Sequence, residues 1–110
     1  MKLPNGANAY ITSQKLDRYL LSETHPIGRA KAKFLRGLGF DESTITMLER
    51  ALIATAQSEE VKETISSVHG TKYVIDGMLQ TPSGRLVGVR TVWIIDRGQE
   101  RPRLVTAYPV

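Results

Sequence analysis

The spacing of apolar residues changes half-way along the chain. In the first half, apolar residues recur every three or four positions, which is the period of a helix and predicts three short helices. The first begins at a Ser13 cap, the second at Pro26, and the third after a cap at Asp41 or Ser43. Gly39 ends the second helix. The residues on the three apolar faces are Leu16, Tyr19, Leu20, Ile27, Ala30, Phe34, Leu35, Leu38, Ile45, Leu48, Leu52 and Ala56.

The second half has the composition of β-strands. The third helix ends within the polar stretch Gln57 to Ser67, and Val, Ile and Thr are frequent after His69. Turn residues at Thr81 to Gly84 and a longer loop at Asp96 to Arg101 divide this half. The predicted strands are Lys72–Leu79, Arg85–Ile95 and Arg103–Tyr108.

These elements predict a single α+β domain over residues 1–110, because a chain of this length does not hold two independent cores. We expect N-terminal helices, over about 12–57, to pack on one face of a C-terminal antiparallel β-meander, over about 71–108. No apolar run approaches the ~18 residues that span a bilayer. The start of the sequence lacks the layout of a signal peptide, so the expected location is the cytosol.

Counting along the predicted hairpins gives each strand residue a face. Pairing Gln80 with Arg85, and Ile95 with Pro102, sets the expected register. One face then gathers two threonines, a tryptophan and a tyrosine, which are Thr91, Thr106, Trp93 and Tyr108. Hydroxyl groups beside an aromatic ring suit a phosphate and a stacked base. The alternative is structural, since a tryptophan in a strand is more often a core residue.

Two arginines lie within these strands. Arg90 occupies the middle of a Val-rich strand and needs a partner, either a carboxylate such as Asp76 or Glu49, or a phosphate. Arg103 begins the last strand, where it is either a charge at the rim or a contact to a ligand.

The second helix carries the most distinctive chemistry. Lys31 falls on its apolar side, where a lysine is unexpected, and His25 stands at its entrance. An imidazole exchanges protons near neutral pH, and Lys31 can bring positive charge to a phosphate. The structural alternatives are a capping histidine and a lysine whose stem lies on the core while its ammonium reaches water. The opposite side carries Arg29, Lys33 and Arg36, which is either a basic patch for phosphates or a solvated face.

Charge and composition narrow the function classes. The chain has 15 Lys and Arg against 11 Asp and Glu, a net charge of +4, and no cysteine. Disulfide frameworks and thiolate metal sites are thereby excluded. The common nucleotide, metal and serine-hydrolase motifs are absent, so we expect no metal and no cofactor.

A set of short motifs resembles a family of small bacterial proteins of uncharacterised function. The motifs are Leu3-Pro4-Asn5, Tyr19 to Ser22, the His-Pro-x-Gly-x-x-Lys-Ala-x-Phe run from His25 to Phe34, Leu38 to Phe40, Thr91 to Ile95, and Pro102 to Pro109. The layout is also similar to the ribonuclease toxin group that includes barnase, EndoU, colicin nucleases and RelE. That similarity implies helix residues His25 and Lys31 and strand residues Arg90, Thr91, Thr106 and Tyr108 at a catalytic site. The chain lacks the strand glutamate of barnase and the second strand histidine of EndoU.

The sequence therefore leads to the hypothesis of a metal-independent endoribonuclease, the toxin of a toxin–antitoxin or immunity pair. Its partners would be RNA and a cognate antitoxin or immunity protein, with no membrane involved. The expected substrate-binding residues are Arg29, Lys33, Arg36, Trp93 and Arg103. A non-enzymatic protein-binding or immunity-type module is the alternative, and RNA binding without cleavage is a third hypothesis.

Overall fold

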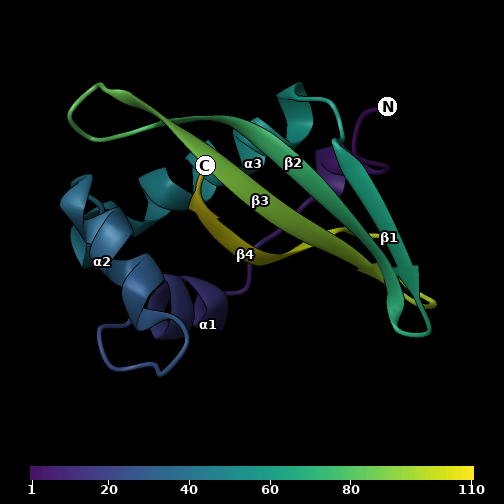
Figure 1. Cartoon of the computed structure of the whole chain (residues 1–110), viewed down its shortest axis with the longest axis horizontal. Coiled ribbons are helices and arrows are strands. Elements are labelled where there is room, and N and C mark those ends of the chain that lie inside the picture. The colour runs from purple at the N-terminus through teal and green to yellow at the C-terminus, as the bar shows by residue number, and fades with distance from the viewer.

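The second half of the chain forms a four-stranded antiparallel sheet (Figure 1). The computed structural model describes all residues from 1 to 110. The strands are β1 (Glu63–Ser67), β2 (Gly70–Gln80), β3 (Leu86–Asp96) and β4 (Arg103–Pro109), and they follow one another across the sheet in that order. The predicted meander is confirmed, and a strand that the sequence did not predict precedes it.

That additional strand, β1, lies in the polar stretch where only the end of a helix was expected. Its five residues are all exposed, so no alternation of apolar and polar positions marks it. It is held by antiparallel pairing with residues Gly70 to Val74 of β2. Gly70 has a φ of +144°, and a Cβ there would lie 2.3 Å from the carbonyl oxygen of Ile95. Backbone pairing and this glycine, rather than side-chain burial, place β1 in the sheet.

The register of the first hairpin differs by one residue from the prediction. Gln80 pairs with Leu86 instead of Arg85. A slip of one residue exchanges the two faces of a strand. The inward-facing residues of β2 and β3 are therefore Tyr73, Ile75, Leu79, Val87, Val89, Thr91 and Trp93.

The second hairpin has the predicted register next to its turn, where Ile94 pairs with Arg103 and Trp93 pairs with Leu104, but a bulge between Val92 and Trp93 shifts the remaining pairs by one residue. Thr106 pairs with Val92, and Tyr108 pairs with Arg90. The expected shared face of Thr91, Trp93, Thr106 and Tyr108 is thus wrong. The first two residues point into the core, and the last two lie on the opposite face.

The first helical segment comprises α1 (Ser13–Lys15) and η2 (Leu16–Leu20), after a short turn η1 (Gly6–Asn8). Thr12, and not Ser13, caps it, because the Thr12 hydroxyl accepts a hydrogen bond from the Lys15 N–H at 3.1 Å. The η2 part has π-helical geometry.

The second helix, α2 (Arg29–Gly37), begins three residues later than predicted because Pro26 to Gly28 form a turn. It ends at Gly37, and Gly39, which has a φ of +99°, supplies the predicted stop two residues later. The Phe40 N–H donates to the Leu35 carbonyl at 3.1 Å, and the Gly39 N–H donates to the Arg36 carbonyl at 3.0 Å. This pair of bonds is the Schellman arrangement, in which glycine supplies the left-handed residue.

The third helix, α3 (Ile45–Ser58), follows a 3₁₀ turn, η3 (Glu42–Thr44). Of the two predicted caps, Asp41 serves: its carboxylate accepts the Ser43 N–H at 2.8 Å, and the Thr44 hydroxyl accepts the Asp41 N–H at 2.9 Å. In Figure 1, α3 crosses behind the sheet, and α1 and α2 lie beside it. Contacts of α3 with β2, and of α2 with β4, join the two halves.

The core lies between the helices and the inner face of the sheet. Its largest fully buried side chains include Trp93, Phe40, Leu20, Leu35 and Leu52. Apolar side chains from every major helix and from three strands contribute to this single cluster. The predicted α+β arrangement, with helices on one face of an antiparallel sheet, is confirmed. None of the helices combines the length and the apolar character that crossing a membrane requires.

Candidate functional site

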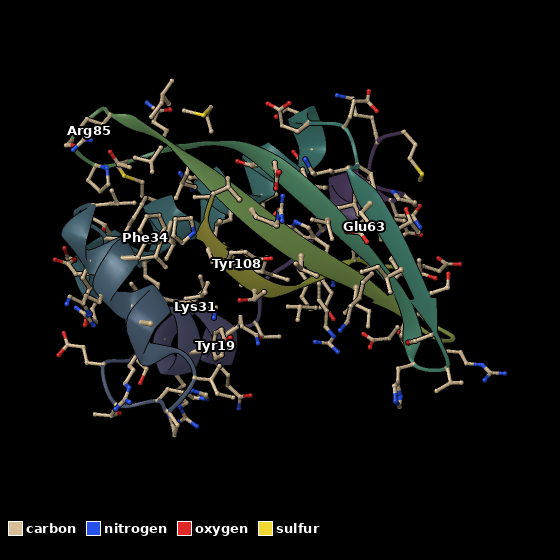
Figure 2. The ribbon with its side chains drawn as sticks, in the orientation of Figure 1. Tyr19, Lys31, Phe34, Glu63, Arg85 and Tyr108 are labelled. Atoms are coloured by element: carbon tan, nitrogen blue, oxygen red, sulfur yellow. The ribbon has the colours of Figure 1, made fainter.

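Tyr19 lies where the helical segment η2 meets the edge strand β4. Its hydroxyl is 3.5 Å from the hydroxyl of Thr106 on β4. The ammonium nitrogen of Lys15 is 4.2 Å from the centre of the Tyr19 ring, and that of Lys31 is 5.7 Å away. Tyr19, Lys31 and Tyr108 of β4 are labelled in Figure 2. We call Lys15, Tyr19, Lys31 and Thr106 the lysine–tyrosine cluster.

Local sequence explains how two lysines reach one phenol. Lys15 precedes Tyr19 by four residues, which places both on the same side of the helical segment. Lys31 comes from α2, three residues after Gly28. Gly28 is buried against the Tyr19 backbone, where a Cβ would lie 2.3 Å from the Tyr19 carbonyl oxygen. Only glycine permits this approach, and the approach brings Lys31 to the Tyr19 ring.

The electrostatics of the cluster favour an anion. Burial opposes ionisation of Tyr19, but the Thr106 hydroxyl and the ammonium groups of Lys31 and Lys15 outweigh it, so the pKa of Tyr19 lies below its ordinary value. The pKa of Lys15 is also lowered, first by burial and further by the charges of Arg103 and Lys31. Neither Lys15 nor Lys31 takes part in a salt bridge. Two cations without a carboxylate partner therefore surround one phenol.

His25 has a well-defined structural position beside the cluster. Its Nδ1 accepts the N–H groups of Ile27, at 3.1 Å, and of Gly28, at 2.9 Å. Its ring meets the Tyr19 ring edge-on, with 5.0 Å between centres. The lone pair on Nδ1 is thus in use, and Nε2 carries the proton of the neutral ring. His25 therefore caps the turn, which is the structural alternative that the sequence left open. Its hydrogen bonds hold the turn in which Gly28 packs against Tyr19.

A family model described as a domain of unknown function, DUF6883, matches residues 2–110. The chain belongs to this family. No curated protein sequence matches it. Among solved structures, this DUF6883 domain is similar to a chain of a contact-dependent growth inhibition toxin–immunity protein complex from Klebsiella pneumoniae 342. The TM-score is 0.72 at 17% identity, over 94% of this chain and 95% of that one. At that identity the likeness is one of fold.

The strand arginines of this DUF6883 domain are held by carboxylates. Arg90 donates hydrogen bonds to both carboxylate oxygens of Asp76, at 2.7 and 2.9 Å. Of the partners that the sequence left open for Arg90, a carboxylate or a phosphate, the structure has the carboxylate. Asp76 and, more weakly, Tyr108 raise the pKa of Arg90. Arg103 is paired in the same two-pronged way with Asp96, at 2.7 and 3.0 Å. Arg90 and Tyr108 are cross-strand neighbours on the face that also carries Thr106.

Two expected site residues do not reach the surface. Thr91 and Trp93 are fully buried. The Trp93 Nε1–H donates to the Thr91 hydroxyl at 2.9 Å, and that hydroxyl donates to the Ile75 carbonyl at 3.0 Å. The expected platform for stacking a base is therefore wrong for Trp93, and Thr91 is a polar link within the core. The one-residue change of register explains both corrections.

Of the three basic residues on the outer side of α2, one is held by hydrogen bonds and ion pairs and two are exposed. Arg36 donates to the Leu21 carbonyl, at 2.8 Å, and to the carboxylate of Glu42, at 2.5 Å, and also pairs with Glu23. It joins α2 to the preceding and following loops, which is a structural role that the sequence did not predict. Arg29 and Lys33 remain exposed along an open groove of about 550 Å³.

Sequence reasoning missed Lys15 and Tyr19, while Lys31 and Thr106 were expected. Tyr19 was assigned to the apolar face of the first helix, where its ring does pack against the core. The available signal was the four-residue spacing between a lysine and a tyrosine, which predicts a cation–π contact. No cluster of His, Asp and Glu side chains has the arrangement of a metal site.

Proposed function

We propose that this chain is a metal-independent endoribonuclease and the toxin of a toxin–immunity or toxin–antitoxin pair. The observation that carries the proposal is the lysine–tyrosine cluster, in which two unpaired ammonium groups flank a phenol with a lowered pKa. Unpaired cations near a proton donor suit a phosphodiester, whose charge increases in the transition state. The fold likeness to a chain of a toxin–immunity complex supports the second half of the proposal.

In the proposed reaction, the 2′-oxygen of a ribose attacks the adjacent phosphorus. A 2′-O–P bond forms and the P–5′-O bond breaks, leaving a 2′,3′-cyclic phosphate and a 5′-hydroxyl. Lys15 accepts the 2′-hydroxyl proton when it is in its neutral form, which the lowered pKa makes easier to reach than for an ordinary lysine. Tyr19 gives its proton to the departing 5′-oxygen and regains one from Lys15 after release.

The other cluster residues bind charge. Lys31 neutralises the non-bridging oxygens of the phosphate, and the Thr106 hydroxyl donates a hydrogen bond to one of them. Tyr108 and Arg90 extend this surface along β4 and β3. Arg29 and Lys33 hold the neighbouring phosphates of the RNA. Tyr19 rather than His25 donates the proton, because the Nδ1 of His25 already accepts two backbone hydrogen bonds.

Inducible expression in bacteria, followed by growth and RNA integrity, tests the proposal. The parent chain should arrest growth and leave RNA fragments with 2′,3′-cyclic phosphate ends. Lys31→Ala should lower the cleavage rate of the purified chain by at least about 100-fold. Arg97→Ala is the matched control, since Arg97 is an exposed cation in the loop after β3 with no role in the proposed site, and it should alter the rate by no more than about threefold. Equal RNA cleavage by parent and Lys31→Ala chains, both verified as folded, would refute the proposed site.

The alternative is an immunity-type or other protein-binding module. The observation in its favour is that the similar solved structure contains a toxin and an immunity protein, and a likeness of fold does not distinguish their functions. That alternative predicts normal growth and intact RNA on expression of the parent chain. The same experiment therefore decides between the two functions.

A further inference from the structure

A second surface, away from the lysine–tyrosine cluster, has the features of a protein-docking groove. It runs between α3 and the end of the β2–β3 hairpin and has a volume of about 620 Å³. Three large apolar side chains that line it are unusually exposed: Met47 at 47%, Met78 at 54% and Leu86 at 60%. Flexible methionine side chains that face solvent together are typical of surfaces that adapt to a partner.

The same groove borders an open sheet edge. β1 pairs only with residues 70 to 74 of β2, so the remainder of β2 has a strand neighbour on one side only. The Val74 carbonyl accepts the Lys62 N–H from the β1 side. Because backbone groups alternate in direction along an antiparallel strand, the N–H and C=O groups of Met78 and Gln80 point to this open edge. Unpaired edge groups of this kind bind an added strand.

The charge of the groove indicates the chemistry of its occupant. Arg50 is the one charged residue among those that line it. Arg85, next to Leu86, adds a second cation at the tip of the β2–β3 hairpin (Figure 2). The chain as a whole carries a net charge of +4. An acidic segment is therefore complementary to the groove, whereas a basic segment is repelled.

We infer that an extended, acidic segment of a partner protein pairs with the open edge of β2 at Met78 and Gln80. One apolar side chain of that segment enters between Met47, Met78 and Leu86, and a carboxylate pairs with Arg50. If the proposed toxin function holds, this partner is the immunity protein, and that identification rests on the proposed function. The docking of an acidic segment in the groove does not depend on it. None of the cluster residues lines the groove.

The test selects 16-residue peptides from a displayed random library on the full chain, made by cell-free synthesis. Enriched peptides should combine Asp or Glu with a large apolar residue. Their affinity should fall by about tenfold or more on Met78→Lys and on Arg50→Glu. Ile65→Lys and Arg97→Glu are the matched controls, because Ile65 is exposed on β1 and Arg97 is exposed in the turn after β3; each should change the affinity by less than about twofold. Hydrogen exchange at the Met78 and Gln80 amides should slow when the peptide binds.

Three outcomes would overturn the inference. Enriched peptides without acidic residues, or no enrichment, would refute the proposed chemistry. Affinity that is unchanged in folded Met78→Lys and Arg50→Glu chains would place binding elsewhere. A parent chain that sediments as a dimer, with a monomeric Met78→Lys variant, would assign the groove to a second copy. Intact RNA with the parent chain would refute the ribonuclease proposal alone, since peptide binding is measured without RNA.

Discussion

Replacing Gly28 with alanine tests how closely α2 packs on the segment that carries Tyr19. Gly28 has φ −79° and ψ −18°, a helical conformation that alanine adopts without strain. Chain entropy alone therefore predicts that Gly28→Ala raises the free energy of unfolding by about 0.4–1 kcal/mol. The packing predicts the opposite sign, because the new Cβ would lie 2.3 Å from the Tyr19 carbonyl oxygen and 3.0 Å from its carbon.

The clash cannot be relieved by a side-chain rotation, since both atoms that it involves are backbone. Inserting a methyl group into such a contact costs about 1–3 kcal/mol. After subtraction of the entropic gain, Gly28→Ala should lower the free energy of unfolding by up to about 2.6 kcal/mol, with a central value of about 1.3 kcal/mol. It should also displace Tyr19 from Lys31, since the two elements must separate to admit the methyl group.

Gly37 provides a control in the same helix. A Cβ at Gly37 would meet nothing within 4 Å, so Gly37→Ala should stabilise the chain by about 0.4–1 kcal/mol. Urea unfolding, followed by the fluorescence of the single tryptophan, Trp93, measures both variants. If Gly28→Ala proved as stabilising as Gly37→Ala, the close contact between α2 and Tyr19 would be refuted.

Two further predictions concern the sheet. Thr91→Val should lower the free energy of unfolding by about 1–3 kcal/mol, because it leaves the buried Trp93 Nε1–H without an acceptor. Thr91→Ser, which keeps the hydroxyl, should lower it less, and urea unfolding compares the two. The hydrogen bond from Arg90 lowers the pKa of Asp76, so its stabilising contribution is present above the unfolded pKa of about 3.9 and is lost as the pH falls through the lower folded pKa. In the parent, the urea midpoint should therefore fall between about pH 5 and pH 2, and Asp76→Asn should make this fall smaller. Asp17→Asn, at an exposed residue outside the salt bridges, should leave the fall unchanged. Equal falls for the parent and Asp76→Asn would contradict this prediction.

The fold was predictable where burial leaves a periodic pattern. The helices and three of the strands place apolar residues at regular intervals, and their order along the chain determines the α+β class. β1 leaves no such pattern, because all five of its residues are exposed and its stability comes from backbone pairing. Which residues of β3 and β4 share a face was predicted by counting residues through the two hairpin turns. One residue of difference in the first turn was enough to move Thr91 and Trp93 into the core, and the bulge in the β3–β4 pairing placed Thr106 and Tyr108 on the opposite face.

The candidate site was predictable only where a residue conflicts with its local pattern. Lys31 stands out because it interrupts the apolar side of a helix. Tyr19 does not stand out, since an aromatic ring suits an apolar face and its hydroxyl leaves no trace in the spacing. Lys15 resembles any lysine near the surface until the fold brings Lys31 and Arg103 near it. The chemistry of the cluster thus arises from contacts between elements, which a single sequence does not contain.

The His-Pro-x-Gly-x-x-Lys motif has one geometric purpose in this structure. His25 caps the turn through Nδ1, Gly28 allows the turn to touch the Tyr19 backbone, and Lys31 then reaches the Tyr19 ring. A substitution of His25 therefore disturbs the cluster whether or not the imidazole takes part in chemistry. Loss of activity in His25→Ala alone would not identify a catalytic histidine. Lys31→Ala leaves the turn and its hydrogen bonds intact, so a loss of RNA cleavage with an unchanged free energy of unfolding assigns the function to the ammonium group itself.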